Sequence, residues 1–103
     1  MYMTRNLTDK ERETLYNEVR INGKFTFKGN KVDRVDMAAL QLLPDNCLLN
    51  EDANQVFFKG ECQLTEHDDG GDMTGLATFT GSAEMIGLNE LVLSPKPIMI
   101  TKS

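Results

Sequence analysis

The sequence predicts an α+β domain, in which two short helices from the N-terminal half pack on a mostly antiparallel sheet of five or six strands. The main observation is one long central β-hairpin running from Gln55 to Ile86, whose two halves each alternate between apolar and polar residues. The second observation is a pair of helix-like patterns, at residues 9–20 and 33–43. We expect residues 1–103 to fold as a single domain with a flexible segment at residues 1–6.

The first helix is predicted by its start signal. Thr8 followed three residues later by Glu11 fits a capping box, in which each side chain bonds to the backbone of the other residue. A narrow apolar stripe follows, so we expect a helix from Asp9 to about Arg20. Asn22-Gly23 suits the end of this helix, and its alternative role, a hairpin turn, would put the flanking apolar residues on opposite faces.

Short strands are predicted on both sides of the central hairpin. Residues 24–28 alternate as one strand, and the turn signal Gly29-Asn30 after it would pair Phe27 with Val32. The other apolar runs that we interpret as strands are residues 46–49, 91–93 and 98–100. The last run is interpreted as a closing core strand, and its alternative is an edge strand that pairs with another chain.

The second helix is expected between Asp33 and Pro44. Either Asp33 or Asp36 can cap its start, and Pro44 would end it. Its apolar positions would be Val35, Ala38, Ala39, Leu42 and Leu43.

The register of the central hairpin is predicted from its turn. Gly70-Gly71 is a two-residue turn signal, because both positions can take a positive φ without steric cost. This turn would bring the two apolar sets onto one face of the sheet. The resulting pairs would be Val56–Met85, Phe58–Ala83, Gly60–Gly81, Cys62–Phe79 and Leu64–Ala77. A wider loop would shift the register by two residues and pair Gly60 with Phe79.

The hairpin is long for a chain of this size. Its first half, residues 56–69, would extend roughly 45 Å, whereas a domain of ~100 residues has a radius of gyration of about 13 Å. Either the hairpin bends or its tip projects from the body. The tip holds the densest acidic run in the chain. The residues that we expect to bind a partner are Glu66, His67, Asp68, Asp69 and Asp72.

The charge distribution limits the classes of partner. The net charge is −5, but residues 1–34 hold eight basic residues against five acidic ones, and residues 35–103 hold three against 11. The acidic part argues against direct binding to nucleic acid and favours cationic partners. No apolar run approaches the ~20 residues of a membrane helix, and we recognise no secretory signal. We therefore expect Cys47 and Cys62 to be free thiols in the cytoplasm.

The sequence lacks the residue patterns of an enzyme. His67 is the one histidine, and it would project from the opposite face of an extended strand to Cys62, too far along to activate that thiol. No glycine-rich phosphate loop is present, and we expect no cofactor. Glu66, Asp68, Asp69 and Asp72 could offer oxygen ligands to calcium, and Asp69 and Asp72 would lie directly opposite each other beside the Gly70-Gly71 turn.

These observations favour a small acidic protein that binds a protein partner and has no enzymatic activity. As an accessory or inhibitor protein, it would use the acidic hairpin tip to contact a basic surface, with no direct contact to nucleic acid or membrane. The first alternative is a structural subunit of a homo-oligomeric assembly, in which the hairpin reaches onto a neighbouring copy. The second alternative is a domain that binds calcium or another small ligand.

Overall fold

The computed structural model describes residues 3–102 and shows a mixed sheet of nine strands with one helix in that part of the chain. Strands make up 57% of the chain and helix 20%. The predicted α+β class, with two helices on a five- or six-stranded sheet, is therefore wrong. The elements are β1 (Thr4–Asn6), α1 (Asp9–Asn22), β2 (Phe25–Phe27), β3 (Asn30–Lys31), the 3-10 turn η1 (Arg34–Asp36), β4 (Met37–Leu42), the 3-10 turn η2 (Pro44–Asn46), β5 (Leu48–Asn50), β6 (Gln55–Asp68), β7 (Gly71–Gly87), β8 (Glu90–Leu93) and β9 (Ile98–Lys102).

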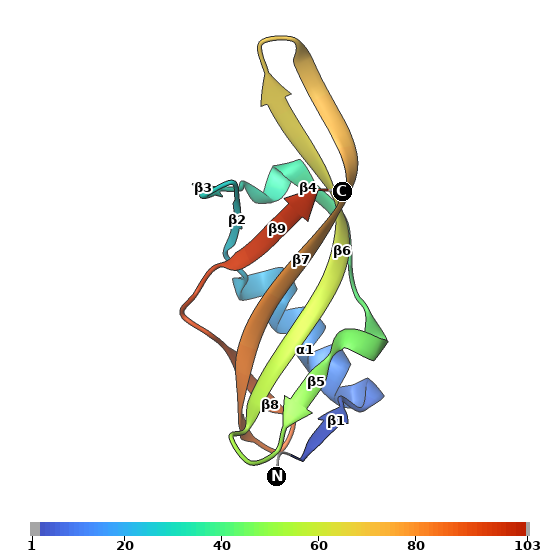
Figure 1. Ribbon diagram of the computed structural model, residues 1–103, viewed down its shortest axis with the longest axis vertical. Coiled ribbons are helices and arrows are strands. Elements are labelled where there is room, and N and C mark those ends of the chain that lie inside the picture. Colours follow the sequence, from blue (N-terminus) through green and yellow to red (C-terminus); the bar gives the residue numbers. More distant parts are fainter. Residues whose placement is uncertain (1–2, 103) are drawn as a thin grey trace.

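The sheet is organised around its two longest strands, β6 and β7 (Figure 1). Its order is β1-β5-β6-β7-β9-β2-β3, with β4 pairing further along β6 and β8 pairing further along β7. The described neighbours are antiparallel except for β2 and β9, which run parallel. Helix α1 lies behind the sheet in the view of Figure 1, and apolar side chains of both form the core between them.

The predicted central hairpin is present, but its register differs from the predicted one. The two turn residues are Asp69-Gly70 rather than Gly70-Gly71, which shifts every pair by two residues. Gly60 therefore pairs with Phe79, as in the alternative register, although the loop is no wider. The pairs on the buried face are Val56–Ala83, Phe58–Gly81, Gly60–Phe79, Cys62–Ala77 and Leu64–Gly75.

Packing of aromatic rings on glycines explains this register. The ring of Phe79 lies over Gly60, where an added Cβ would come within 2.2 Å of the ring. Phe58 covers Gly81 in the same way, at 2.4 Å from the position of a Cβ. Each ring fills the space that a missing side chain leaves on the opposite strand, which stabilises glycine inside a sheet. The predicted register would instead have placed Gly60 opposite Gly81 and left this space empty.

The predicted second helix is replaced by a strand. Residues Met37–Leu42 form β4, which pairs with β6 and buries the side chain of Met37. Ala39 has a left-handed φ of 53° at a bulge, where the pairing skips from Ala38 to Gln41. Pairing satisfies backbone groups along the edge of β6 and buries apolar area. The free energy gained by this pairing is larger than that of the amphipathic helix that the spacing of the apolar residues indicates.

The turn after β2 is also one residue earlier than predicted. Lys28 and Gly29 are the turn residues, with φ values of 53° and 80°. Left-handed values at both positions are typical of a type I′ turn, which matches the twist of the flanking strands. Phe27 therefore pairs with Asn30 and not with Val32.

The first and last strands that the structure describes, β1 and β9, lie in the sheet. Within the segment expected to be flexible, residues 1–6, Thr4–Asn6 form β1, and residues 1–2 lie outside the described part. The predicted strand at residues 98–100 belongs to β9, which lies between β7 and β2. Its interpretation as a closing core strand is confirmed, and the alternative of an edge strand is wrong.

Helix α1 has the predicted capping box. Thr8 Oγ1 accepts a hydrogen bond from the backbone N–H of Glu11, and the Glu11 carboxylate accepts one from the backbone N–H of Thr8. The guanidinium of Arg5 donates two more bonds to this carboxylate, at 2.8 and 2.9 Å. Glu11 is 7% exposed, and the bonds from Arg5 hold its pKa at about 2. The start of α1 is thereby tied to β1.

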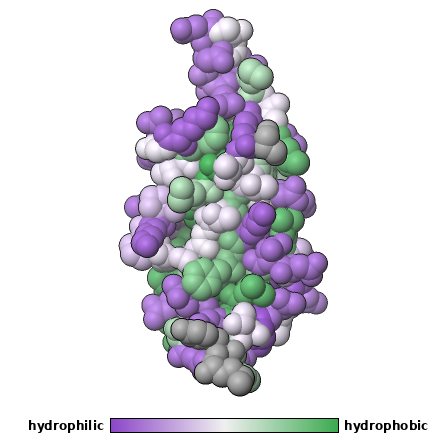
Figure 2. All heavy atoms as spheres, in the orientation of Figure 1, coloured by the Kyte–Doolittle hydropathy of each residue, from purple (hydrophilic) through white to green (hydrophobic). Residues whose placement is uncertain are grey.

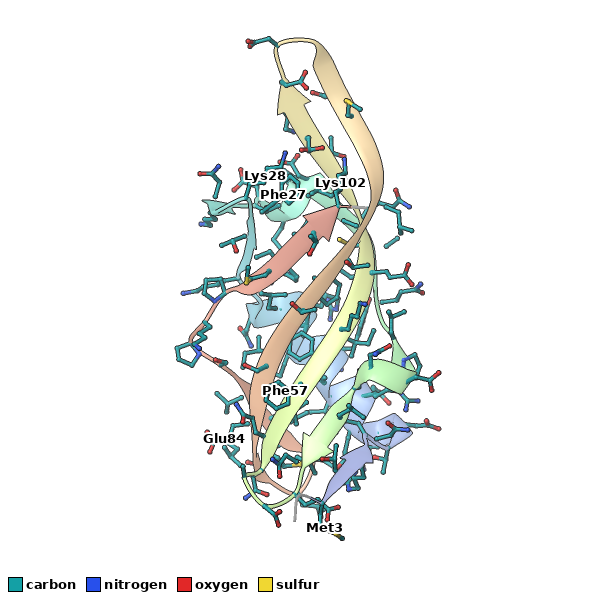
Figure 3. The ribbon with its side chains drawn as sticks, viewed as in Figure 1. Met3, Phe27, Lys28, Phe57, Glu84 and Lys102 are labelled. Carbon is teal, nitrogen blue, oxygen red and sulfur yellow. The ribbon has the colours of Figure 1, made fainter. Side chains whose placement is uncertain are left out.

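The two faces of the sheet differ in what covers them. On the inner face, alternate residues of β6 and β7 form one buried core with Leu15 and Val19 of α1. On the outer face, Phe57 and Met99 are half or more exposed. Figure 2 shows the outer face, with hydrophobic and weakly polar residues along its centre and hydrophilic residues at its margins. Phe57 projects near the lower part of this face (Figure 3).

Candidate functional site

The candidate site is the projecting end of the central hairpin, residues 65–76, which we call the arm. The last pair between β6 and β4 is at Leu64, and the last pair between β7 and β9 is at Ala77. Beyond these two residues neither β4 nor β9 pairs with the hairpin, whose turn projects from the body (Figure 1), and the molecule measures 50 × 24 × 23 Å. Of the two shapes that the sequence leaves open, the projecting tip is the one observed.

All five predicted site residues lie on the arm, but they do not form a single cluster. Asp68 and Asp69 lie at the turn, where the Asp68 carboxylate accepts a hydrogen bond from the backbone N–H of Gly70 at 2.8 Å. Asp69 is exposed. The other three residues lie nearer the base of the arm and have charged partners: Glu66, His67 and Asp72.

The His67 imidazole lies between two carboxylates. Its Nδ1 is 2.6 Å from Oδ1 of Asp72 on the neighbouring strand, and its Nε2 is 2.7 Å from Oδ1 of Asp36 in η1. A protonated imidazole can donate both of these hydrogen bonds. The bond to Asp36, followed by the bond to Asp72, raises the pKa of His67 to about 9. The histidine is therefore a cation at neutral pH and links the arm to the body.

A second ion pair holds the other face of the arm. Lys102 Nζ, at the end of β9 and the base of the arm (Figure 3), donates a hydrogen bond to Glu66 Oε2 at 2.8 Å. This bond from Lys102 lowers the pKa of Glu66. Neighbouring residues of a strand project to opposite faces, so Glu66 and His67 fasten the two faces of the arm to different parts of the body.

These contacts leave the negative charge unevenly distributed along the arm. Lys102 offsets Glu66, and protonated His67 offsets Asp72. Asp68 and Asp69 have no ion pair within residues 3–102. The least compensated negative charge is therefore at the turn, farthest from the body.

The predicted calcium ligands do not face each other. Asp72 lies opposite His67, while Asp69 lies in the turn, because the register differs from the predicted one. Within the described residues, no group of three or more His, Cys, Asp or Glu side chains is placed to hold a metal ion. The predicted opposition of Asp69 and Asp72 is therefore wrong.

The two cysteines are free thiols buried in the core. Burial raises the pKa of both Cys47 and Cys62, which disfavours their reactive thiolate form. Both ring nitrogens of His67 face carboxylates, so neither is directed at Cys62.

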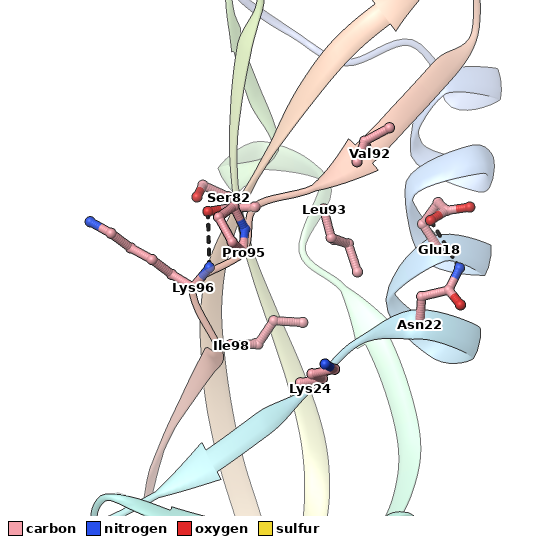
Figure 4. Close-up of a pocket in the computed structure, with 10 residues that line it drawn as sticks. Glu18, Asn22, Lys24, Ser82, Val92, Leu93, Pro95, Lys96 and Ile98 are labelled. Atoms are coloured by element: carbon pink, nitrogen blue, oxygen red, sulfur yellow. Dashed lines mark hydrogen bonds between the residues drawn. The ribbon is translucent and has the colours of Figure 1, made fainter.

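Two open grooves share the loop between β8 and β9. The first, of about 300 Å³, lies between this loop and the end of α1 (Figure 4). In it the Glu18 carboxylate accepts a hydrogen bond from Asn22 at 3.1 Å, and the backbone N–H of Lys96 donates to Ser94 at 3.3 Å. The second groove, of about 400 Å³, is lined from β7, β8 and the same loop. Neither groove is lined by a histidine or a cysteine.

Sequence reasoning missed the two residues that fasten the arm, Asp36 and Lys102. Local spacing carries no signal for them, since 31 residues separate Asp36 from His67 and 36 separate Glu66 from Lys102. The pairing of β4 with β6 and of β9 with β7 is what brings these charges to the base of the arm.

No protein-family model, curated protein or solved structure matches this chain. In residues 3–102, no helix has both the length and the apolar character needed to cross a membrane. The arrangement of the arm is thus the observation from which a function can be proposed.

Proposed function

We propose that this protein is a small acidic module without enzymatic activity, an accessory or inhibitor protein, that binds a protein partner through the arm. The observation that carries the proposal is an arm that projects from the body with Asp68 and Asp69 at its far end. Neither carboxylate has an ion pair in the described residues. A basic surface on the partner would supply the opposite charge and speed the encounter.

The fastening of the arm supports this proposal. Ordering a flexible segment on binding costs conformational entropy, which lowers affinity. Glu66 and His67 are already held by Lys102 and Asp36 in the free protein. A partner would therefore meet an arm whose base is ordered before binding.

The expected location and partner class follow from the cysteines and the charge. We propose a cytoplasmic location, which the two free thiols of Cys47 and Cys62 support, because reducing compartments keep thiols in that state. The net charge of −5 favours a cationic protein as partner over nucleic acid.

The double variant Asp68→Asn/Asp69→Asn tests the proposal. Immobilised wild type and variant are used to capture proteins from a cell lysate, and the bound proteins are quantified by mass spectrometry. Loss of two negative charges at the turn should weaken retention of the partner and reduce its sensitivity to salt. Both side chains are exposed, and neither has a hydrogen bond or ion pair to the body within residues 3–102, so the fold should persist.

A matched control removes two charges elsewhere. Glu13 and Asp45 are exposed on the body, and the double variant Glu13→Gln/Asp45→Asn changes the net charge by the same amount. Retention should be unchanged in this control. Equal retention by all three proteins would refute the arm as the binding element.

A structural subunit of a homo-oligomer is the second candidate, and one observation favours it. The chain carries its own basic region in residues 1–34, and Lys28 of this region lies with Lys102 at a groove beside the base of the arm (Figure 3). The arm of one copy could contact this region of the next copy. Sedimentation velocity at several concentrations is the test, and a monomer at every concentration would contradict this candidate.

A further inference from the structure

The two edges of the arm differ in accessibility. On the β6 side, η1 approaches the arm, and Asp36 reaches His67 across that edge. On the β7 side, β9 pairs with β7 up to Ala77. Between Gly71 and Gly75, no strand of the described residues pairs with β7 on that side (Figure 1). One edge of the arm is thus crossed by the body, and the other, which we call the open edge, has no strand paired to it among residues 3–102.

The register shows which backbone groups the open edge presents. The backbone N–H of Met85 bonds to Asn54 at 2.8 Å, so odd-numbered residues of β7 direct their backbone groups to the β6 side. The carbonyl of Ser82 accepts a bond from Ser94 at 2.9 Å, so even-numbered residues face the other way. Such alternation is a property of antiparallel ladders, and the β6–β7 register continues without a shift to the turn.

Asp72 and Thr74 therefore direct their N–H and C=O groups to the open edge. The residues of the same parity nearer the body, Thr78 and Thr80, pair with β9. An added strand in line with β9 would complete the ladder along the arm. Unpaired edges of this kind are templates for strand addition.

The side chains along the edge indicate the chemistry of the added strand. Asp72 projects to one face and Met73, which is 61% exposed, projects to the other. Residues 65–76 contain four carboxylates and no lysine or arginine. A segment that alternates basic and apolar residues would place charge beside Asp72 and apolar area beside Met73.

We propose that the open edge of β7 at Asp72 and Thr74 receives an extended basic segment of the partner as an additional strand, antiparallel to β7. This inference rests on the proposed function and specifies the partner as an extended segment rather than a folded basic surface. Backbone hydrogen bonds supply affinity at such an edge, and the alternating side chains supply specificity.

A synthetic hexapeptide that alternates lysine and valine is the probe. It is titrated into the full chain, and hydrogen exchange of each backbone amide is followed by NMR. Binding should slow exchange at Asp72 and Thr74. Two control peptides carry N-methyl groups at alternate residues. One peptide is methylated at the odd-numbered positions and the other at the even-numbered positions, so the blocked amides lie on opposite edges of the strand. The control whose blocked positions would face β7 should bind about tenfold more weakly, for the loss of hydrogen bonds of about 1 kcal/mol each.

Two substitutions at Thr74 separate its backbone from its side chain. Thr74→Pro removes the N–H at the open edge, a position where proline is tolerated in a strand. Thr74→Val keeps the N–H, and both variants lose the hydroxyl bond to Thr65. The proline variant should bind the peptide about tenfold more weakly than the valine variant.

Equal binding of all three peptides, or unchanged exchange at Asp72 and Thr74 in the bound state, would overturn the added strand. If the proline variant fails to fold, the exchange measurement on the unsubstituted protein still tests the added strand. The proposed function is tested separately, because Asp68→Asn/Asp69→Asn changes charge at the turn and leaves the backbone edge intact. If that variant lost its capture of the partner from lysate while all peptides bound equally, the proposal of binding through the acidic arm would stand and the proposal of strand addition would be refuted.

Discussion

His67 and Asp36 join the arm to the body, with Nε2 of the imidazole 2.7 Å from Oδ1 of the carboxylate. The contact spans 31 residues of sequence and lies at the point where the hairpin leaves the sheet. The protonation state of a single side chain is therefore coupled to how the arm is held.

Replacing Asp36 should lower the pKa of His67. The hydrogen bond to Asp36 is the largest cause that raises this pKa to about 9, so Asp36→Asn should move it towards about 6.5. Because the folded-state pKa is raised, the stabilisation is fully present below about 6.5 and is lost as pH rises through about 9. NMR titration gives a single histidine signal, since the chain has one histidine. An unchanged midpoint in Asp36→Asn, with Asp45→Asn as control, would contradict the contact.

Replacing Glu11 should destabilise the protein in a pH-dependent way. Glu11→Gln removes the charge that accepts two bonds from Arg5 and should cost about 1–2 kcal/mol at neutral pH. The folded-state pKa is lowered to about 2, so this stabilisation is present above the ordinary value of about 4.5 and is lost as pH falls from there through about 2. Urea unfolding at several pH values measures it. Glu13→Gln, an exposed change on the same helix, should have little effect, and equal losses in the two variants would refute the role of Glu11.

Adding a methyl group to Gly60 should test the register directly. The new Cβ would lie 2.2 Å from the Phe79 ring and 2.6 Å from the Gln41 carbonyl oxygen. Gly60→Ala should therefore destabilise the protein by about 1–3 kcal/mol or more. Gly75→Ala on the partner strand meets its nearest atom at 3.5 Å and should be close to neutral. Thermal unfolding compares the two, and a neutral Gly60→Ala would show that Phe79 does not cover this glycine.

Amide exchange in the free protein should alternate along β7. The N–H groups of Met73 and Gly75 point towards β6 and should exchange slowly, whereas those of Asp72 and Thr74 point to the open edge and should exchange fast. NMR detection resolves the four amides. The opposite alternation would mean that the hairpin is paired in another phase.

Much of the central hairpin could be predicted from the sequence, but its register could not. The alternation of apolar and polar residues located both strands, since burial of one face is a property of each strand alone. The register depends on which side chain fills the space over Gly60, and this is decided between strands. Local chemistry alone favours a Gly70-Gly71 turn. Packing of Phe79 on Gly60 stabilises the observed register more than that turn would stabilise the predicted one.

The prediction of a second helix was wrong, and the contacts that hold the arm were missed, for a related reason. The apolar residues of Met37–Leu42 have a spacing that suits a helix, and the left-handed conformation of Ala39 has no sequence signal. Once β4 is known to pair with β6, Asp36 falls beside the base of the arm. The acidic tip was identified from composition, but its charge balance depends on Asp36 and Lys102 from distant segments.

The open edge of β7 also bears on the colloidal behaviour of the protein. Two arms that met edge to edge would form a continuous ribbon, the first step of strand-by-strand aggregation. Both arms carry Asp68, Asp69 and Asp72, so like charges oppose this encounter at neutral pH. High salt, which screens these charges, would remove the repulsion. The same carboxylates that we expect to attract a basic strand thus disfavour edge-to-edge association between two copies of the protein.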